Sequence, residues 1–270
     1  MPSELYISRA ALHMWEEPPI SATRGSGTIF FSGCSLGCVF CQNNEISRGV
    51  CGKKVTTERL AEIMLELEAQ GAHNVNLVTP THYVPTVKDA IILAKSQGLA
   101  LPIVYNTGSF DTVEALKMLD GLVDIYLPDL KYFLPKTAKK YSNAPTYPEA
   151  ARRAIAEMVR QTGKPQLDEE GVMIRGTIVR ILLLPAHVAE AKLSLRYLIQ
   201  TYGDSIYISL MNQYTPMKNA PAPLNRRVTR DEYRDLVEYA EKLGLKNGFI
   251  QEFGTAEKSY IPSFDGKGLD

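Results

Sequence analysis

This chain of 270 residues has few cysteines, no net charge and no long apolar run. It has only 4 cysteines, and its 30 lysines and arginines are balanced by 30 aspartates and glutamates. A net charge of zero gives no indication of a nucleic-acid or membrane partner. No apolar run reaches the roughly 20 residues that span a bilayer, and residues 1–9 lack the basic-then-apolar pattern of a signal peptide. We therefore expect a cytoplasmic protein whose thiols stay reduced.

Three of the four cysteines are concentrated in one short stretch. Cys34, Cys38 and Cys41 have the spacing Cys-x3-Cys-x2-Cys. Three thiolates on one loop can bind three irons of a cubic iron–sulfur cluster and leave the fourth iron open to a substrate. A four-cysteine electron-transfer cluster has no such open position. The spacing therefore predicts a [4Fe–4S] cluster that takes part in chemistry.

Other interpretations of the motif are a zinc site, a ferredoxin cluster or structural thiols. Zinc would need a second cysteine knuckle or histidines at short spacing. The histidines instead lie singly, at His13, His73, His82 and His187. A ferredoxin cluster needs a fourth cysteine at another spacing. Cys51, ten positions after Cys41, could be a fourth ligand, but we interpret it as a free thiol near the site.

Short apolar runs alternate with amphipathic stretches, which is typical of a parallel sheet with crossover helices. Strands are predicted at residues 28–32, 75–78, 103–105, 123–127, 177–184 and 206–210, with another short strand at 249–252. Helices are predicted at residues 57–69, 87–96, 111–120, 147–161, 188–201 and 229–243, with Asp111 as an N-cap. Polar and Gly/Pro-containing segments follow the strands, as in barrel enzymes whose active sites lie at the strands' carboxyl ends. This α/β pattern predicts an incomplete (β/α)6 barrel, with a flat open sheet as the alternative.

The pattern also predicts how the chain is divided. Residues 28–245 would form the partial barrel. Residues 1–27 lack the βα pattern, and we expect them to pack on the outside of the barrel or cover a rim. Residues 246–270 would form a C-terminal extension.

The cysteine motif is the signature of the radical S-adenosylmethionine (SAM) superfamily. Residues 25–43, with Gln42 and Asn43 after the third cysteine, resemble the glycyl-radical-enzyme activating proteins of the pyruvate formate-lyase activating type. The run 127–131 is similar to their Asp-x-Lys motif, and the run 179–185 to their arginine-containing fifth strand. The resemblance extends over residues 25–215 or so, and it implies the radical SAM type of partial barrel.

The resemblance also implies two cofactors and their contacts. A [4Fe–4S] cluster would be held by the three cysteines, and Phe40 would pack on the adenine ring of S-adenosyl-L-methionine. Asp129 would accept a hydrogen bond from the α-amino group or a ribose hydroxyl, and Lys131 would pair with the α-carboxylate. Arg180 lies within an apolar strand, so it should face the barrel interior and an anion, because an unpaired buried guanidinium is costly. A salt bridge to a neighbouring strand is the alternative.

Two turns differ from those of the activating proteins. The usual Gly-Gly-Glu run, which holds the methionine amino group, is replaced by residues 79–82, Thr-Pro-Thr-His. Oxygens of Thr79 and Thr81 could substitute, but the carboxylate is missing. The turn at 105–108 is Tyr-Asn-Thr-Gly instead of Asp-Thr-Asn-Gly, so we predict no monovalent cation site there. Thr79 and Asn106 are predicted to bind the cofactor, and a different substrate pocket could be lined by His82, Asn106, Asn212, Gln213 and Tyr214.

Three functions fit these observations. The first is an activase-like enzyme that cleaves SAM to a 5′-deoxyadenosyl radical and removes a hydrogen atom from a glycyl-radical protein. The second is a radical enzyme that modifies a small molecule or peptide, and the third is a non-catalytic iron–sulfur carrier. The enzymatic functions need an electron from a flavodoxin- or ferredoxin-like donor. Because an open iron reacts with oxygen, we expect an anaerobic setting.

Overall fold

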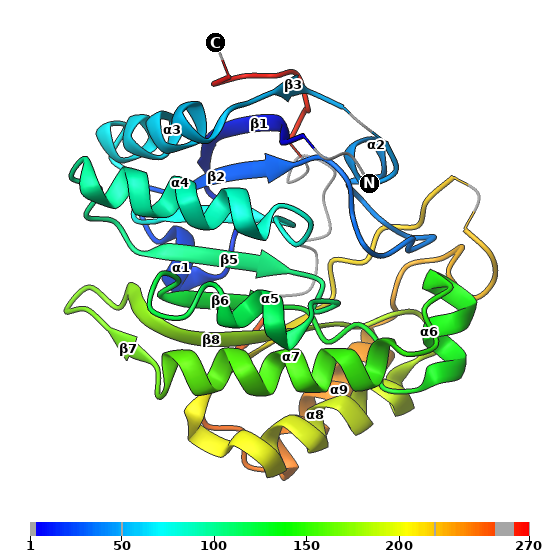
Figure 1. Ribbon diagram of the computed structural model, residues 1–270. Coiled ribbons are helices and arrows are strands. Elements are labelled where there is room, and N and C mark those ends of the chain that lie inside the picture. Colours follow the sequence, from blue (N-terminus) through cyan, green and yellow to red (C-terminus); the bar gives the residue numbers. More distant parts are fainter. Residues whose placement is uncertain (1–3, 50, 219, 252–261, 270) are drawn as a thin grey trace.

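In the computed structural model, a twisted sheet curves into an open barrel with helices outside it (Figure 1). The structure describes residues 4–49, 51–218, 220–251 and 262–269. Seven neighbouring strands run parallel: β2 (Ser26–Phe31), β4 (Val75–Val78), β5 (Ile103–Thr107), β6 (Ile125–Pro128), β8 (Met173–Leu182), β9 (Tyr207–Met211) and β10 (Gly248–Ile250). Within the described ranges, no strand pairing joins the two ends of this order. The predicted incomplete barrel is therefore confirmed.

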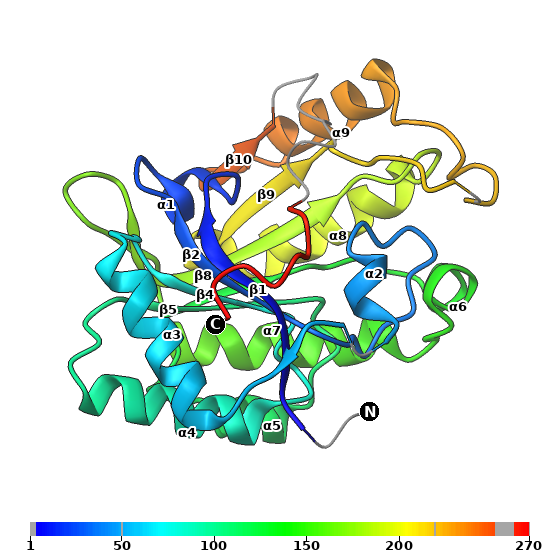
Figure 2. The same ribbon diagram turned by 90° about the horizontal axis from the view of Figure 1, so that it is seen from above.

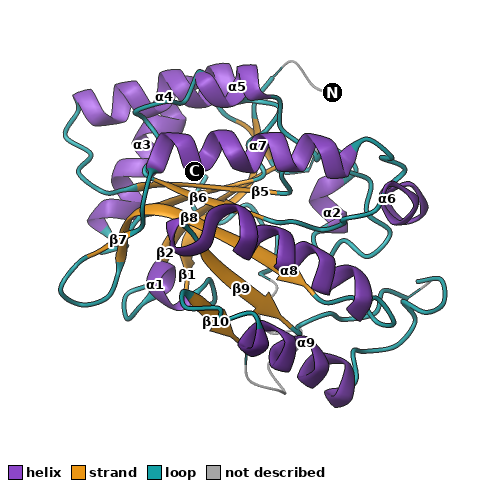
Figure 3. Ribbon diagram, turned by 90° about the horizontal axis from the view of Figure 1, so that it is seen from below, coloured by secondary structure: helices purple, strands orange, loops and turns teal. Residues whose placement is uncertain are grey.

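Helices cover the outer face of the sheet (Figure 3). They are α3 (Thr57–Ala69), α4 (Val84–Ser96), α5 (Val113–Lys117), α7 (Tyr147–Thr162), α8 (Val188–Tyr202) and α9 (Arg230–Lys242). Alternate strand residues divide between two layers, because successive side chains point to opposite faces. Ile103 and Tyr105 pack in the cluster that contains α3 and α4, whereas Val104 packs in a separate cluster with Ile125 and Ile20. That separate cluster fills the lower part of the barrel interior.

The N-terminal segment is part of the sheet. β1 (Tyr6–His13) pairs antiparallel with β2, and the short helix α1 (Pro18–Ser21) follows it. The described C-terminal residues run beside β1, where the Ala10 N–H donates to the Lys267 carbonyl at 2.9 Å (Figure 2). β1 thus extends the sheet, within a segment that we had expected to pack on the outside of the barrel or cover a rim. The domain boundaries themselves stay a prediction.

Several short elements escaped the sequence pattern. They are α2 (Asn44–Ser47), β3 (Lys53–Lys54), α6 (Pro135–Ser142), β7 (Gln166–Leu167) and the 3-10 turn η1 (Gly203–Ser205). The predicted N-cap at Asp111 is wrong: Thr112 caps α5, and Asp111 accepts hydrogen bonds from Tyr105 and Thr107. None of the helices in the described part of the chain is long and apolar enough to cross a membrane.

Candidate functional site

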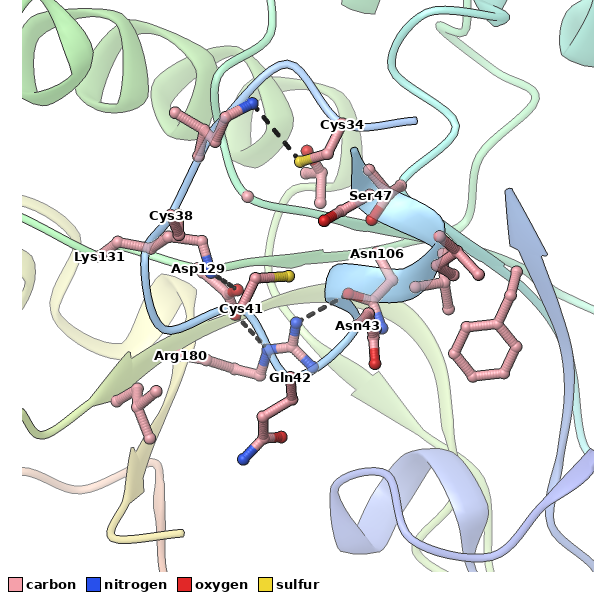
Figure 4. A pocket seen from close by; sticks show the side chains of 18 of the residues that line it. Cys34, Cys38, Cys41, Gln42, Asn43, Ser47, Asn106, Asp129, Lys131 and Arg180 are labelled. Carbon is pink, nitrogen blue, oxygen red and sulfur yellow. Dashed lines mark hydrogen bonds and ion pairs between the residues drawn. The ribbon is translucent and has the colours of Figure 1, made fainter. Parts of the chain in front are cut away.

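A cavity of about 250 Å³ opens at the carboxyl ends of the parallel strands (Figure 4). All three clustered cysteines line it, together with Phe40 from the same loop. The opposite wall comes from the strand ends, which contribute Thr79, Asn106, Asp129, Lys131 and Arg180. The cysteine loop and the predicted cofactor-binding residues at the strand ends therefore face one another across one cavity.

The cysteine loop begins at a turn that favours glycine. Gly33 has φ +90, and a Cβ there would lie 3.1 Å from Nε2 of His82. Its N–H donates to the Ile46 carbonyl at 2.7 Å, which ties the start of the loop to α2. The Val39 N–H donates to the Tyr141 carbonyl at 2.9 Å, which ties its middle to α6. The loop is held by backbone bonds at both places, so its thiols have defined directions.

The three thiols suit a cluster whose irons are bound separately. All are free of disulfides. Burial raises the pKa of Cys34 to about 11, with Cys38 and Cys41 adding to the effect, so this thiol would ionise on binding iron, which stabilises the thiolate. Among the described residues, no three Cys, His, Asp or Glu side chains converge as ligands of one metal ion would. A [4Fe–4S] cluster does not need its ligands to converge on one point, because each thiolate binds a different iron. Cys51 is not among the residues that line the cavity; it packs behind it against Phe30, Ile46 and Val78.

The opposite wall carries a chain of paired charges from β5, β6 and β8. Arg180 Nε lies 2.6 Å from Asp129 Oδ1, and Lys131 Nζ lies 2.5 Å from Asp129 Oδ2. Arg180 Nη2 donates to Asn106 Oδ1 at 2.7 Å. Arg180 thus faces the cavity and also forms the salt bridge to a neighbouring strand that was its alternative interpretation. Asp129 and Lys131 pair with each other, which leaves their predicted contacts to the cofactor untested.

Two carboxylates that the sequence analysis did not identify join this network: Glu16, which lines the cavity, and Glu17, which lies behind the lining residues. Glu16 and Glu17 follow β1 and lie 3.4 and 3.9 Å from Arg180 Nη1. Glu16 Oε1 also accepts hydrogen bonds from the amides of Asn76, at 3.1 Å, and Asn106, at 3.4 Å. We call Glu16, Glu17, Asp129, Lys131 and Arg180 the charged wall. The only signal in the sequence was an acidic pair ahead of two prolines, in a segment without periodicity.

Burial and neighbouring charges oppose one another within the charged wall. Burial alone would raise the pKa of Asp129, but Arg180 and Lys131 bring it below its ordinary value. Burial would lower the pKa of Lys131, yet the Asp129 carboxylate raises it, so this pair stays ionised. Glu17 differs, because burial raises its pKa to about 7 despite the nearby Arg180. Burial likewise raises the pKa of Glu16, with Arg180 opposing the effect.

The other predicted residues fall into two groups. Thr79 and Gln213 line the cavity, and Thr79 has φ 59, a strained value for a β-branched residue. Tyr214 is buried, packs edge-on against Phe40 at 6.1 Å, and donates to the Leu224 carbonyl. The Asn212 N–H donates to the Gln251 side chain, and His82 lies beside Gly33 beneath the cysteine loop. The structure thus brings Gln213 to the cavity and leaves His82, Asn212 and Tyr214 outside the residues that line it.

A loop with three thiols at the strand ends of an open parallel barrel is the arrangement expected of an iron–sulfur enzyme. Comparison with known proteins identifies the family. The Radical SAM superfamily matches residues 28–190, and the chain belongs to this superfamily. Its members use a [4Fe–4S] cluster and S-adenosyl-L-methionine, so both are cofactors of this protein.

Relatives and solved structures agree with that assignment. The chain is 30% identical over 254 residues to "Uncharacterized protein MJ0674" of Methanocaldococcus jannaschii, covering 90% of this chain and 69% of the relative. SuiB of Streptococcus suis bound to S-adenosylmethionine has a TM-score of 0.57 and 11% identity, covering 86% of this chain and 52% of SuiB. Methylornithine synthase (PylB) has a TM-score of 0.55 and 18% identity, covering 79% of this chain and 61% of PylB. The chain spans about half the length of SuiB, and identities this low show a shared fold only.

Proposed function

We propose that this protein is an activase-like radical SAM enzyme that removes a hydrogen atom from a glycine Cα of a partner protein. The observation that carries the proposal is the position of the cavity. His13 from β1 and Met211 from β9 both line it, although these strands lie near opposite ends of the strand order. Among the described residues no strand pairing closes the sheet between these ends, and a barrel open on that side would suit the entry of a polypeptide loop.

When bound, the cluster would supply an electron and SAM would supply the 5′-deoxyadenosyl group that takes up the hydrogen atom. The protein's own residues bind and position. Cys34, Cys38 and Cys41 would hold the cluster. Asp129 and Lys131 offer a carboxylate and an ammonium group to the amino-acid end of SAM. Phe40, which lines the cavity, would pack on the adenine ring.

The protein also has to keep the reacting carbon close and other hydrogen donors away. Arg180 serves this purpose because its N–H groups already bind Asp129, Asn106 and Glu16, so few of them remain to bind stray water. An external flavodoxin- or ferredoxin-like protein would supply the electron. This partner and the glycyl-radical protein are both part of the proposal.

A second candidate is a radical enzyme that acts on a small molecule or peptide. It is favoured by the turn at residues 79–82, which lacks the Gly-Gly-Glu of the activating proteins, and by Glu16, which brings a carboxylate into the cavity from another part of the chain. Together they give the cavity a different polar lining, which would suit a different substrate.

An anaerobic assay separates these functions. The full chain is reconstituted with iron and sulfide, reduced, and mixed with SAM and with pyruvate formate-lyase as the glycyl-radical protein. A glycyl radical detected by electron paramagnetic resonance (EPR), formed together with 5′-deoxyadenosine, would support the activase. Production of 5′-deoxyadenosine without a protein radical, with hydrogen abstracted from a small molecule or peptide, would support the second candidate. A stable cluster that never cleaves SAM would favour an iron–sulfur carrier.

A further inference from the structure

The end of α6 makes a hydrogen-bonded connection to the middle cysteine of the motif. Ser142, the last residue of α6, donates from Oγ to Cys38 Sγ at 2.9 Å. The hydroxyl of Tyr132 lies 2.6 Å from the same Oγ. Ser142 has a single hydroxyl hydrogen, which it donates to sulfur, so Tyr132 is the donor in the second bond. The result is a relay from Tyr132 through Ser142 to Cys38.

The relay is buried along its whole length. Tyr132 is 1% exposed, Ser142 5% and Cys38 7%. Inside a protein a hydroxyl that loses its partner has no water to replace it, so these groups are committed to one another. A hydroxyl that accepts a hydrogen bond also becomes a better donor, because bonds in a chain polarise one another. Tyr132 therefore strengthens the bond that Ser142 makes to sulfur.

The backbone fixes the relay in place. α6 ends at Ser142, and Asn143 follows in the left-handed region with φ 51. The neighbouring Tyr141 carbonyl accepts from the Val39 N–H, so the helix end and the cysteine loop are joined by a backbone bond beside the side-chain bond. The Tyr132 ring packs edge-on against Tyr147 with centroids 5.4 Å apart. This packing fixes the position of the Tyr132 ring and so holds its hydroxyl near Ser142.

Cys34 has a weaker arrangement. Its Sγ accepts the Leu36 backbone N–H at 3.4 Å, from within the same loop. The bond to Cys38 is shorter and comes from a helix 104 positions away in sequence. The two sulfurs would therefore be tuned by different parts of the chain.

We propose that the Tyr132–Ser142 pair raises the reduction potential of the cluster through Cys38. The relevant couple is the one-electron reduction of the cluster from the 2+ to the 1+ state, in which no bond is formed or broken. The added electron makes the thiolate sulfurs more negative, so a hydrogen bond donated to one of them stabilises the reduced state more than the oxidised state. Ser142 and Tyr132 act through the ligand and are positioning residues. The proposal depends on a cluster at these cysteines and is independent of the enzyme's substrate.

The test is an anaerobic redox titration of the reconstituted full chain, with dithionite as electron source and EPR of the reduced cluster as the signal. Ser142→Ala should make the midpoint potential more negative, by the equivalent of a threefold to tenfold change in the reduction equilibrium, or about 30–60 mV at 59 mV per decade. Tyr132→Phe should shift it the same way by less, and Ser142→Thr, which keeps the hydroxyl, should restore it.

Ser109→Ala is the matched control. Its Oγ is buried and makes no hydrogen bond to any residue that the structure describes, so removing it should leave the potential unchanged. Iron and sulfide contents are measured for every variant. An unchanged potential in Ser142→Ala with a full cluster would overturn the proposal. If Ser142→Ala loses its cluster, Tyr132→Phe decides in the same way. Loss of the cluster in both of these variants and in Ser142→Thr would overturn the proposal in favour of a structural role.

Discussion

The two sides of the cavity are built in opposite ways. The cysteine loop is one continuous segment, residues 33–43, whose important groups are three thiols and a few backbone bonds. The charged wall collects side chains from β6, β8 and the segment after β1, which are far apart in sequence. Each thiol has a task that no other residue can perform. The charges share partners, so the loss of one leaves several others without a counter-charge.

The largest expected effect is that of removing one thiol from the cysteine loop. Cys38→Ala should abolish stable cluster binding and SAM cleavage, because one iron loses its protein ligand. Iron and sulfide per chain, the visible absorbance and 5′-deoxyadenosine are the measurements. Cys51→Ala is the control and should keep all three, since Cys51 lies behind the cavity. A full, active cluster in Cys38→Ala would contradict the assignment of the ligands.

The charged wall is tested at its most connected residue. Arg180→Met should lower the free energy of unfolding by about 3–5 kcal/mol, because it leaves buried carboxylates without their guanidinium. Urea denaturation of the protein without its cluster measures this directly. Arg153→Ala removes an arginine whose side chain is 68% exposed and 4.0 Å from Glu149, and it should cost at most about 1 kcal/mol. Equal losses in the two variants would mean that the charged wall is no more than a surface ion pair.

The pH dependence of stability sharpens the contrast further. With a pKa of about 7 against an ordinary 4.5, folded Glu17 keeps a proton that the unfolded chain has already released. The folded state therefore loses stability as the pH rises from about 4.5 to 7, by up to roughly 3 kcal/mol. Glu17→Gln cannot ionise, so it should lose less stability than the unmodified protein between pH 5 and pH 8. Parallel stability profiles would show that Glu17 is not held protonated.

The smallest expected effect concerns backbone strain beside the cavity. Ser109 has φ 63 and a buried hydroxyl without a partner. Ser109→Gly removes both costs, against a smaller loss of chain entropy, and should stabilise the protein by about 1 kcal/mol. Ser96→Gly, at the exposed end of α4, is the control and should destabilise by up to about 1 kcal/mol. Thermal unfolding of the two variants should move in opposite directions.

The sequence predicted elements well where the periodic pattern was strong. The bounds of α3 and β4 match the prediction, because a regular apolar face and a short buried run leave little choice. β1 was missed because an antiparallel strand at the end of a parallel sheet shows no βα period. α6 was missed because its eight residues contain two lysines near the end and bury few side chains. Thr112 is the N-cap because the Asp111 carboxylate is already occupied by hydrogen bonds from Tyr105 and Thr107.

The sequence alone determined the cofactor class and the alternation of the longer strands and helices. Cysteine spacing and hydrophobic periodicity are local properties of the chain, so they can be interpreted without knowing the tertiary structure. The tertiary structure decided which distant groups meet: Glu16 and Glu17 at Arg180, and Ser142 at Cys38. Burial then decided their chemistry, because removal from water changes the cost of a charge or an unpaired hydroxyl. That cost depends on neighbours that only the folded, curved sheet brings together, so it cannot be predicted from any short stretch of the sequence.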